Sequence, residues 1–173
     1  MRSAAASWSA PPSRGCDPVT RRLVVETDGG SRGNPGPAGY GAVVRDAATG
    51  EVLAELSDFL GHATNNVAEY SGLIAGLRAA AALAPGADVD VRMDSKLVVE
   101  QMSGRWQIKH PGMRPLAAQA RQAVQSLGRV TYTWVPRSRN THADRLANEA
   151  MDAGGARSAA GRARQGGPVG GVR

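Results

Sequence analysis

The order of strand-like and helix-like segments is the feature that most restricts the fold of this chain. Three short segments rich in β-branched and alternating apolar residues come first, and a long helical segment follows them. After that helix, strand-like and helix-like segments alternate. Strands that meander and are then joined by helical crossovers imply a mixed sheet with some parallel neighbours and with helices on its faces. The sequence therefore predicts an α/β domain.

The boundaries of these elements follow from the pattern of apolar residues and from glycine and proline. The expected strands are Leu23–Asp28, Tyr40–Arg45, Val52–Phe59, Val89–Met93 and Val130–Val135. The expected helices are Thr64–Leu83, Ser95–Met102, Arg114–Leu127 and Thr141–Asp152. A turn is expected at Gly29–Gly30, followed by a loop rich in glycine and proline over Ser31–Gly39. The first helix is the clearest, because its apolar residues recur at intervals of three and four.

Length and charge distribution indicate one folded domain with basic ends. A chain of 173 residues can bury one core, which is expected over residues 23–152. Residues 1–22 are expected to form a disordered basic extension, with a targeting peptide as the alternative. Residues 153–173 are expected to form a flexible tail or linker rich in Gly, Ala and Arg. The whole chain has a net charge of +6, but residues 23–152 sum to −1, so the charge of the domain itself does not argue for nucleic acid.

Two further features of the sequence concern its cellular setting. No apolar run approaches the roughly 20 residues that a membrane helix requires, so no membrane partner is expected. Cys16 is the single cysteine, so the chain can form no internal disulfide, and a reducing cytoplasm fits this composition. We therefore expect a cytoplasmic protein, and we expect it to act as a monomer.

Four acidic residues stand at or near the ends of the expected elements: Asp28, Glu69, Asp94 and Asp144. Each has a purely structural alternative. Asp28 precedes two glycines and could form a turn, and Asp94 could cap the helix that follows it. Glu69 follows Asn66 by three residues, the spacing of a reciprocal helix cap. Asp144 stands at the same spacing from Thr141.

The joint placement of the four acids favours a metal site. Asp28 and Asp94 end strands, and open α/β sheets bind ligands at the carboxyl edge of their strands. Glu69 and Asp144 are expected in the first turns of helices near that edge. Carboxylates ~4–5 Å apart repel by roughly 3–4 kcal/mol per pair at an effective dielectric of about 20, so a cation is needed. Oxygen ligands without a Cys or His cluster indicate Mg²⁺ or Mn²⁺, and two such ions suit phosphodiester hydrolysis.

Four blocks of the sequence follow the order of a known family. They are TDGGSRGNPGPAGYGAVV, ATNNVAEYSGLIAGL, VRMDSKLVV and VPRSRNTHADRLANEA, and they spread over residues 23–152. In these blocks the chain resembles ribonuclease H of type 1. The resemblance implies an α/β ribonuclease H-like fold, whose five-stranded mixed sheet has its second strand antiparallel to the others and is flanked by helices. It also implies cleavage of the RNA strand of RNA–DNA hybrids, which leaves 5′-phosphate and 3′-hydroxyl ends.

The resemblance also implies catalytic roles for the four acids. Asp28 would bridge two ions, Mg²⁺ or Mn²⁺, and Glu69 and Asp94 would complete the site with it. Asp144 would support one ion from the last helix. One ion would activate the attacking water, and the other would stabilise the leaving 3′ oxygen.

Several other residues map onto positions with which the family contacts its substrate. They are Gly29, Gly30, Ser31, Asn34, Asn65, Asn66 and Lys96. The two glycines could let a nucleic-acid backbone approach closely, although a tight turn explains them equally well. The two asparagines before Glu69 look like the pair that touches minor-groove edges, with helix capping as the alternative. Contacts to 2′-hydroxyl groups would select the RNA strand.

The chain departs from the family pattern at two places. Lys96 stands where many members have glutamine, and it could pair with a phosphate or be a solvated surface lysine. The loop before Asp144 is short, as in the N-terminal domain of bifunctional ribonuclease H/acid phosphatase proteins. In that short form Arg137 takes the role of a loop histidine, and because arginine stays protonated it could hold phosphate charge but not carry a proton. His142 is the alternative, and it is expected at the surface.

The segment Gly104–Arg114 is basic and lies where longer members carry a positively charged handle. Its cationic side chains could bind phosphates of the DNA strand. Trp106 could stack on the substrate, but core packing is the commoner fate of a tryptophan. The basic ends of the chain could add salt-sensitive affinity. The expected partner is an RNA–DNA hybrid.

Overall fold

The computed structural model describes residues 20–165, and its elements follow the predicted order. The strands are β1 (Arg22–Ser31), β2 (Gly36–Asp46), β3 (Val52–Ala63), β4 (Asp88–Met93) and β5 (Val130–Trp134). The helices are α1 (Asn65–Leu83), α2 (Lys96–Met102), α3 (Arg114–Val124) and α4 (Thr141–Gln165). A short 3-10 turn, η1 (Arg137–Arg139), precedes α4.

All five strands form one mixed sheet in the order β3-β2-β1-β4-β5. β2 runs antiparallel to both of its neighbours, whereas β1, β4 and β5 are mutually parallel. The prediction of a five-stranded sheet whose second strand is antiparallel is therefore confirmed. β1 is central: Asp28 lies opposite Gly41 of β2, and Thr27 lies opposite Met93, the last residue of β4.

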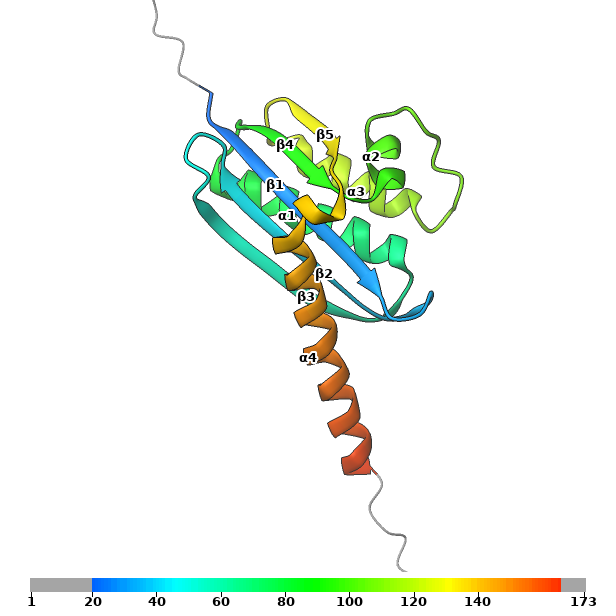
Figure 1. The fold of residues 1–173 in the computed structure, drawn as a ribbon. Helices are drawn as coiled ribbons and strands as arrows, with labels where there is room; N and C mark the ends of the chain where they lie inside the picture. Colours follow the sequence, from blue (N-terminus) through cyan, green and yellow to red (C-terminus); the bar gives the residue numbers. More distant parts are fainter. Residues whose placement is uncertain (1–19, 166–173) are drawn as a thin grey trace, which may run out of the picture.

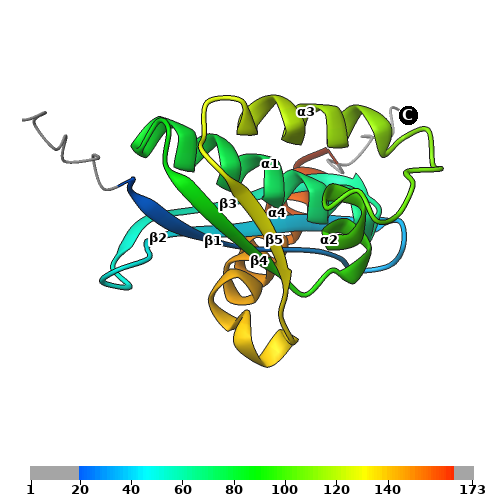
Figure 2. The ribbon, with the colours of Figure 1, turned by 90° about the horizontal axis from the view of Figure 1, so that it is seen from above.

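Helices cover both faces of this sheet. Figures 1 and 2 show α1 and α3 on one face and α4 crossing the other. The main core lies under α1, where Leu23, Val25 and Val91 of the sheet are buried together with Leu73. Successive side chains of a strand point to opposite faces, so Asp28 lies on the face that α4 crosses. The sheet thus separates an apolar core from a face that carries acidic groups.

Glycines in β1 and β2 let two helices approach the sheet closely. A Cβ atom on Gly29 would overlap the backbone of Ala68 in α1. A Cβ atom on Gly41 would overlap the backbone of Ala143 in α4 and would lie 2.6 Å from Cβ of Leu146. A side chain at either glycine would fit only if the helix moved. The atoms that it would overlap belong to the helix backbone, which cannot change rotamer as a side chain can. Both helices are therefore held at fixed positions over the strands.

The turn predicted at Gly29–Gly30 is wrong. β1 continues through both glycines to Ser31, and β2 begins at Gly36, so the predicted glycine-rich loop is reduced to residues 32–35. The two glycines pair with β2, Gly29 opposite Tyr40 and Gly30 opposite Gly39. Pairing across the sheet satisfies their backbone groups and overrides the local preference of glycine for turns.

The last helix is longer than predicted. α4 does not end at Asp152 but continues through Gly154 to Gln165, so residues 153–165 are helical and not the flexible tail that was expected. Gly154 lies against the ring of Phe59 in β3, where a Cβ atom would overlap the ring. This contact offsets the roughly 1 kcal/mol that glycine costs inside a helix.

The ends of the chain, residues 1–19 and 166–173, lie outside the described residues. Most of the predicted N-terminal extension and the last part of the predicted tail fall there, and both stay predictions. Arg22 is an exception, because it begins β1. Among the helices that the structure describes, none combines the length and the apolar character needed to cross a membrane.

The close packing of α4 on β2 predicts the effect of one substitution. Gly41→Ala should lower the free energy of unfolding by about 1–3 kcal/mol, the usual cost of overpacking, because α4 must move away from the sheet. Gly155→Ala is the matched control. Gly155 also belongs to α4, but nothing lies within 4 Å of a Cβ atom built on it. Urea unfolding of both variants measures the difference, and equal stability would contradict close packing of α4 on Gly41.

Candidate metal centre

The parallel strands β1 and β4 bring two predicted acids to one edge of the sheet. Asp28 lies near the end of β1, and Asp94 directly follows the last residue of its neighbour β4. Glu69 comes from α1, whose backbone touches β1 at Gly29. Asp144 comes from the first turn of α4 on the other face. Two strands and two helices therefore deliver the four acids to one region.

Asp28, Glu69 and Asp94 form a compact group. Each has one carboxylate oxygen that lies within 4.8 Å of the chosen oxygens of the other two. Asp28 and Glu69 are only 7% and 5% exposed, and Asp94 is half-buried. Two charges at this separation repel by about 3–4 kcal/mol at an effective dielectric of about 20. The fold thus concentrates negative charge where solvent screens it little.

Burial and mutual repulsion change the acidity of this group. Burial first, and then the charges of Asp94 and Asp144, raise the pKa of Asp28 to about 8. Burial, followed by the charges of Asp28 and Asp94, raises the pKa of Glu69 well above its usual value, although the backbone N–H of Gly29 opposes the shift. With a pKa of about 8, Asp28 retains its proton near neutral pH unless a cation displaces it.

The donor atoms of the group fit a hard divalent cation. Oε2 of Glu69 is buried and has no hydrogen-bond partner. Buried polar atoms are nearly always paired, so an unpaired carboxylate oxygen beside other carboxylates is a candidate ligand atom. Every ligand atom in the group is a carboxylate oxygen, the type that Mg²⁺ and Mn²⁺ prefer. The acidic triad can therefore bind a metal ion.

Asp144 lies beside the triad and has a cationic partner. Nη2 of Arg137 donates to Oδ1 of Asp144 at 2.5 Å, and this contact is the main reason that the pKa of Arg137 is raised. The charge of Asp144 also raises the pKa of Asp28, so the two carboxylates are neighbours. The side chain of Arg137 is 72% exposed, which leaves its guanidinium accessible to a ligand. Arg137, predicted from the short loop, thus reaches the same site.

The capping roles considered for two of the acids do not occur. α1 is capped by Thr64, whose side chain accepts a hydrogen bond from the N–H of Val67 at 3.3 Å, and Glu69 lies beyond the first turn. The residue at the N-cap position of α2 is Ser95 and not Asp94, and no side chain caps this helix. Helix formation therefore does not explain why an acid stands at either position.

An open cavity of about 430 Å³ surrounds the acids. Beside the four acids, its lining comprises Gly29, Gly30, Ser31, Arg32, Asn65, Ser95, Arg137, Asn148 and Met151. The predicted substrate-contacting residues divide accordingly: Gly29, Gly30, Ser31 and Asn65 line the cavity, whereas Asn34, Asn66 and Lys96 do not. Asn34 is linked to the first group, because its Oδ1 accepts a hydrogen bond from the backbone N–H of Asn65 at 3.2 Å.

The sequence did not indicate one buried residue of this site, Asn140. It is 1% exposed, and its Nδ2 donates to the carbonyl of Thr27 at 2.9 Å and to Oδ1 of Asp94 at 3.4 Å. An asparagine directly before a helix is typical of a capping residue, so the sequence alone gives no reason to place it in the interior. In the sequence, only its position four residues before Asp144 relates it to the acids.

His142 and Trp106 both lie outside the cavity. The His142 side chain is 22% exposed; its Nδ1 lies 2.7 Å from Nη2 of Arg45, and its Nε2 contacts Glu55. It therefore lies at the surface, as expected, and is held there by contacts to β2 and β3. Trp106 is 46% exposed, so the expectation of core packing is wrong. Its segment follows the end of α2 and precedes α3, outside both helices.

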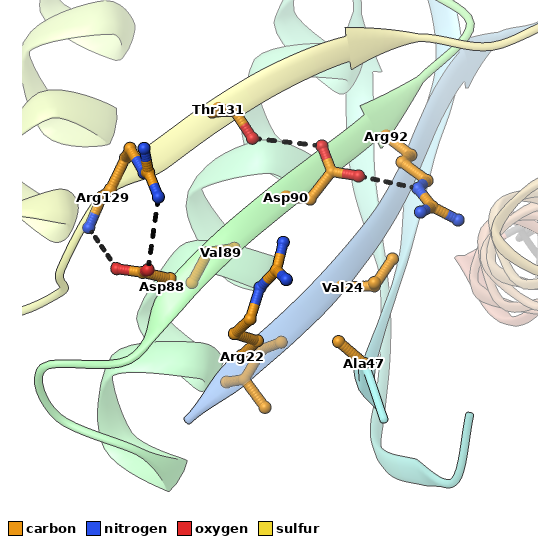
Figure 3. Close-up of a pocket in the computed structure, with 10 residues that line it drawn as sticks. Arg22, Val24, Ala47, Asp88, Val89, Asp90, Arg92, Arg129 and Thr131 are labelled. Carbon is orange, nitrogen blue, oxygen red and sulfur yellow. Dashed lines mark hydrogen bonds and ion pairs between the residues drawn. The ribbon is translucent and has the colours of Figure 1, made fainter. Parts of the chain in front are cut away.

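A second hollow of about 300 Å³ lies toward the amino ends of β1 and β4 (Figure 3). It also contains acids, but each has an arginine partner. Asp90 pairs with Arg92 at 2.9 Å, and Asp88 lies 3.9 Å from Arg129. Local ion pairs thus compensate these charges without a metal ion. The contrast distinguishes the acidic triad, whose members have mainly one another as charged neighbours.

Known proteins with similar sequences cover the whole site. A family model described as reverse transcriptase-like matches residues 26–150, which include all four acids. A bifunctional protein of Mycobacterium tuberculosis is 60% identical over 139 residues, which amount to 80% of this chain. The matched part is 38% of that protein, so this chain spans well under half the length of its curated relative.

Solved structures agree with these matches. The N-terminal RNase H domain of a Mycobacterium tuberculosis protein is 60% identical, with a TM-score of 0.77, and the match covers 81% of this chain and 99% of that one. LC11-RNase H1, solved in complex with an RNA/DNA hybrid, is 39% identical, with a TM-score of 0.73 and coverage of 76% and 98%. Because its sheet topology, its acidic centre and these likenesses agree, the chain belongs to the ribonuclease H family.

Proposed function

We propose that this chain is an endoribonuclease that hydrolyses the RNA strand of RNA–DNA hybrids and leaves 5′-phosphate and 3′-hydroxyl ends. The observation that carries the proposal is the buried group of Asp28, Glu69 and Asp94, whose oxygens lie within 4.8 Å of one another. Such a group suits metal-assisted phosphodiester hydrolysis. The relative solved with an RNA/DNA hybrid supports the substrate class. A protein that only bound hybrids would gain nothing from acids that repel phosphates.

The cofactor in this proposal is a pair of Mg²⁺ or Mn²⁺ ions. Asp28, Glu69, Asp94 and Asp144 would hold them. When bound, the ions lower the pKa of the attacking water and stabilise charge on the leaving oxygen. The four carboxylates would fix the place where the scissile phosphate must lie.

Arg137 would bind the phosphate and would not carry a proton. Arginine stays protonated at any physiological pH, and the ion pair with Asp144 favours the charged form further. Because the side chain is largely exposed, a substrate phosphate in the cavity could compete with Asp144 for the guanidinium. A bidentate contact of this kind would both orient the phosphate and offset its charge.

The residues that line the cavity would contact the hybrid. Gly29 and Gly30 line the cavity and would contact the RNA backbone through their own backbone atoms. Ser31 and Asn65 can exchange hydrogen bonds with 2′-hydroxyl groups, which DNA lacks. Three further residues would act outside the cavity: Asn34 would hold Asn65, and the exposed Asn66 and Lys96 would contact the hybrid beyond it.

The cellular setting in this proposal is a monomer in the cytoplasm. All four acids come from one chain, so the site needs no second copy. The chain has a single cysteine, Cys16, which suits a reducing compartment.

A substrate panel tests the proposed reaction. Labelled RNA–DNA hybrid, double-stranded RNA and duplex DNA are incubated with the protein in Mg²⁺, Mn²⁺ or EDTA. We expect cleavage of the RNA strand of the hybrid alone, and only with a metal ion. Equal cutting of all three substrates would indicate a nuclease of another specificity, and tight binding without cutting would indicate a binding module.

Loss of the central acid should stop the reaction without unfolding the protein. Asp28→Asn should lower turnover of the hybrid by more than about 100-fold, beyond the usual cost of losing a residue that merely supports a ligand. The variant should fold, because asparagine keeps the shape of the side chain and carries no charge that burial would penalise. Asp58→Asn, at an exposed position on β3, should keep the parent rate. An Asp28→Asn variant that cleaves at the parent rate would show that the metal centre is misplaced.

The role of Arg137 has a matched control in the same turn. Arg137→Gln should lower kcat for the hybrid by about 10- to 100-fold, the equivalent of one hydrogen bond to a charged group. Arg139, two residues further along η1, is exposed and has no ion pair among the described residues. Arg139→Gln should therefore change kcat little. Equal losses of kcat in both variants would mean that the two arginines contribute only positive charge and that Arg137 has no specific role.

The raised pKa of Asp28 predicts how the metal-free protein responds to pH. A pKa of about 8 in the folded state, against 3.8 as the ordinary value, means that the folded protein holds one more proton between these pH values. Stability in EDTA should therefore fall as pH rises from about 4 to 8. The slope should be shallower in Asp28→Asn, where the raised pKa of Glu69 still contributes, and in excess Mg²⁺. Thermal unfolding across this range measures it, and a parent curve parallel to that of the variant would show that Asp28 does not cause the slope.

A further inference from the structure

We infer that Asn140 is a positioning residue that fixes the carboxylates of the metal centre relative to one another. The inference rests on the proposed function, since it assigns a role within the same site. Asn140 is not one of the acids, and its side chain does not line the cavity. It would act through the residues that do.

Asn140 contacts the chain beside three of the four acids. Its side-chain Nδ2 donates to the carbonyl of Thr27, the residue before Asp28, at 2.9 Å, and to Oδ1 of Asp94 at 3.4 Å. Its backbone carbonyl accepts a hydrogen bond from the N–H of Asp144 at 3.0 Å. One residue thus links the end of β1, the end of β4 and the start of α4.

Asn140 makes these contacts at the point where the pairing between β1 and β4 ends. The paired residues of β1 and β4 end at Thr27 and Met93, so Asp94 is one residue past the last ladder pair. From there on, β1 continues without β4 beside it. The amide of Asn140 bridges the two chains at this point, and Nε1 of Trp134 donates to the carbonyl of Asp94 at 3.1 Å. Asn140 therefore orients the side chain of Asp94, and Trp134 holds its backbone.

The chemistry of an amide suits this position. A lysine or arginine would neutralise Asp94 and compete with a metal ion, whereas a neutral N–H donor orients the carboxylate and leaves its charge available. The amide of Asn140 bonds to Oδ1 and makes no hydrogen bond to the second carboxylate oxygen of Asp94. Residues that hydrogen-bond to a metal ligand and orient it commonly raise metal affinity or activity by roughly 10- to 100-fold.

Stability alone does not explain this asparagine. Its Oδ1 is buried and has no hydrogen-bond partner. An unpaired buried acceptor costs about 1–3 kcal/mol, so a residue present only for packing would be better replaced by an apolar one of similar size. The donor end of the amide is used for two contacts, while its acceptor end is left unused. The arrangement favours the orientation of Asp94 over the stability of the fold.

Two variants and one control test the inference. Asn140→Ala removes the donor, and Asn140→Ser keeps a hydroxyl donor on a shorter side chain. The control is Gln101→Leu, because Gln101 is also a buried amide, 6% exposed, and accepts a hydrogen bond from Tyr70 at 2.7 Å away from the acids. Each protein is examined by thermal unfolding, by titration calorimetry with Mn²⁺ alone, and by steady-state cleavage of hybrid.

We expect Asn140→Ala to lower both Mn²⁺ affinity and kcat by about 10- to 100-fold with an unchanged KM for the hybrid. Asn140→Ser should fall between this variant and the parent. Gln101→Leu should lose thermal stability but keep the Mn²⁺ affinity and kcat of the parent. Parent-like Mn²⁺ affinity in a folded Asn140→Ala would overturn the inference. A loss of Mn²⁺ affinity in Gln101→Leu as large as that in Asn140→Ala would also overturn it, because affinity would then simply follow thermal stability. Loss of the fold in both Asn140 variants would have the same meaning, since Asn140 would then be a general structural residue.

These outcomes are separable from those of the proposed function. A parent protein that binds Mn²⁺ but leaves the hybrid intact would contradict the proposed reaction. The Mn²⁺ affinities of the four proteins would still decide whether Asn140 positions the acids.

Discussion

Repulsion among buried carboxylates is the interaction on which the rest of this structure depends. Asp28 and Glu69 are almost inaccessible to solvent, and Asp94 stands beside them. Unfolded, the chain could separate these charges and hydrate them. The folded domain forces them together, and the burial of the apolar core supplies the energy for doing so. The stability of the core thus supports the acidic centre.

The acids are brought together by backbone packing more than by side-chain contacts. Parallel neighbours in the sheet align the ends of β1 and β4, and helices set against glycines deliver the remaining two acids. Where the ladder ends, hydrogen bonds from Asn140 and Trp134 continue the connection. Rigid elements therefore carry the four acids, which suits a site whose geometry has to be accurate to a fraction of an ångström.

The sequence predicted the order of the elements, the sheet topology and the region where the acids meet, because periodic apolar residues and motif order reflect the fold as a whole. It failed where long-range packing overrode local preference. Gly29 and Gly30 looked like a turn but pair within the sheet, and Gly154 looked like part of a tail but packs on Phe59. No role for Asn140 followed from the sequence, and only the folded chain shows that its side chain is buried against Thr27 and Asp94. No local pattern encodes contacts between residues as far apart in the chain as Thr27 and Asn140.

The meeting of β1 and α1 at Gly29 has a consequence for the spacing of the acids. With no side chain between the two backbones, main-chain contact fixes how far the backbone of Glu69 lies from the strand that carries Asp28. Any residue larger than glycine would push α1, and Glu69 with it, away from β1. A position without a side chain therefore decides how closely two acids of the site approach each other.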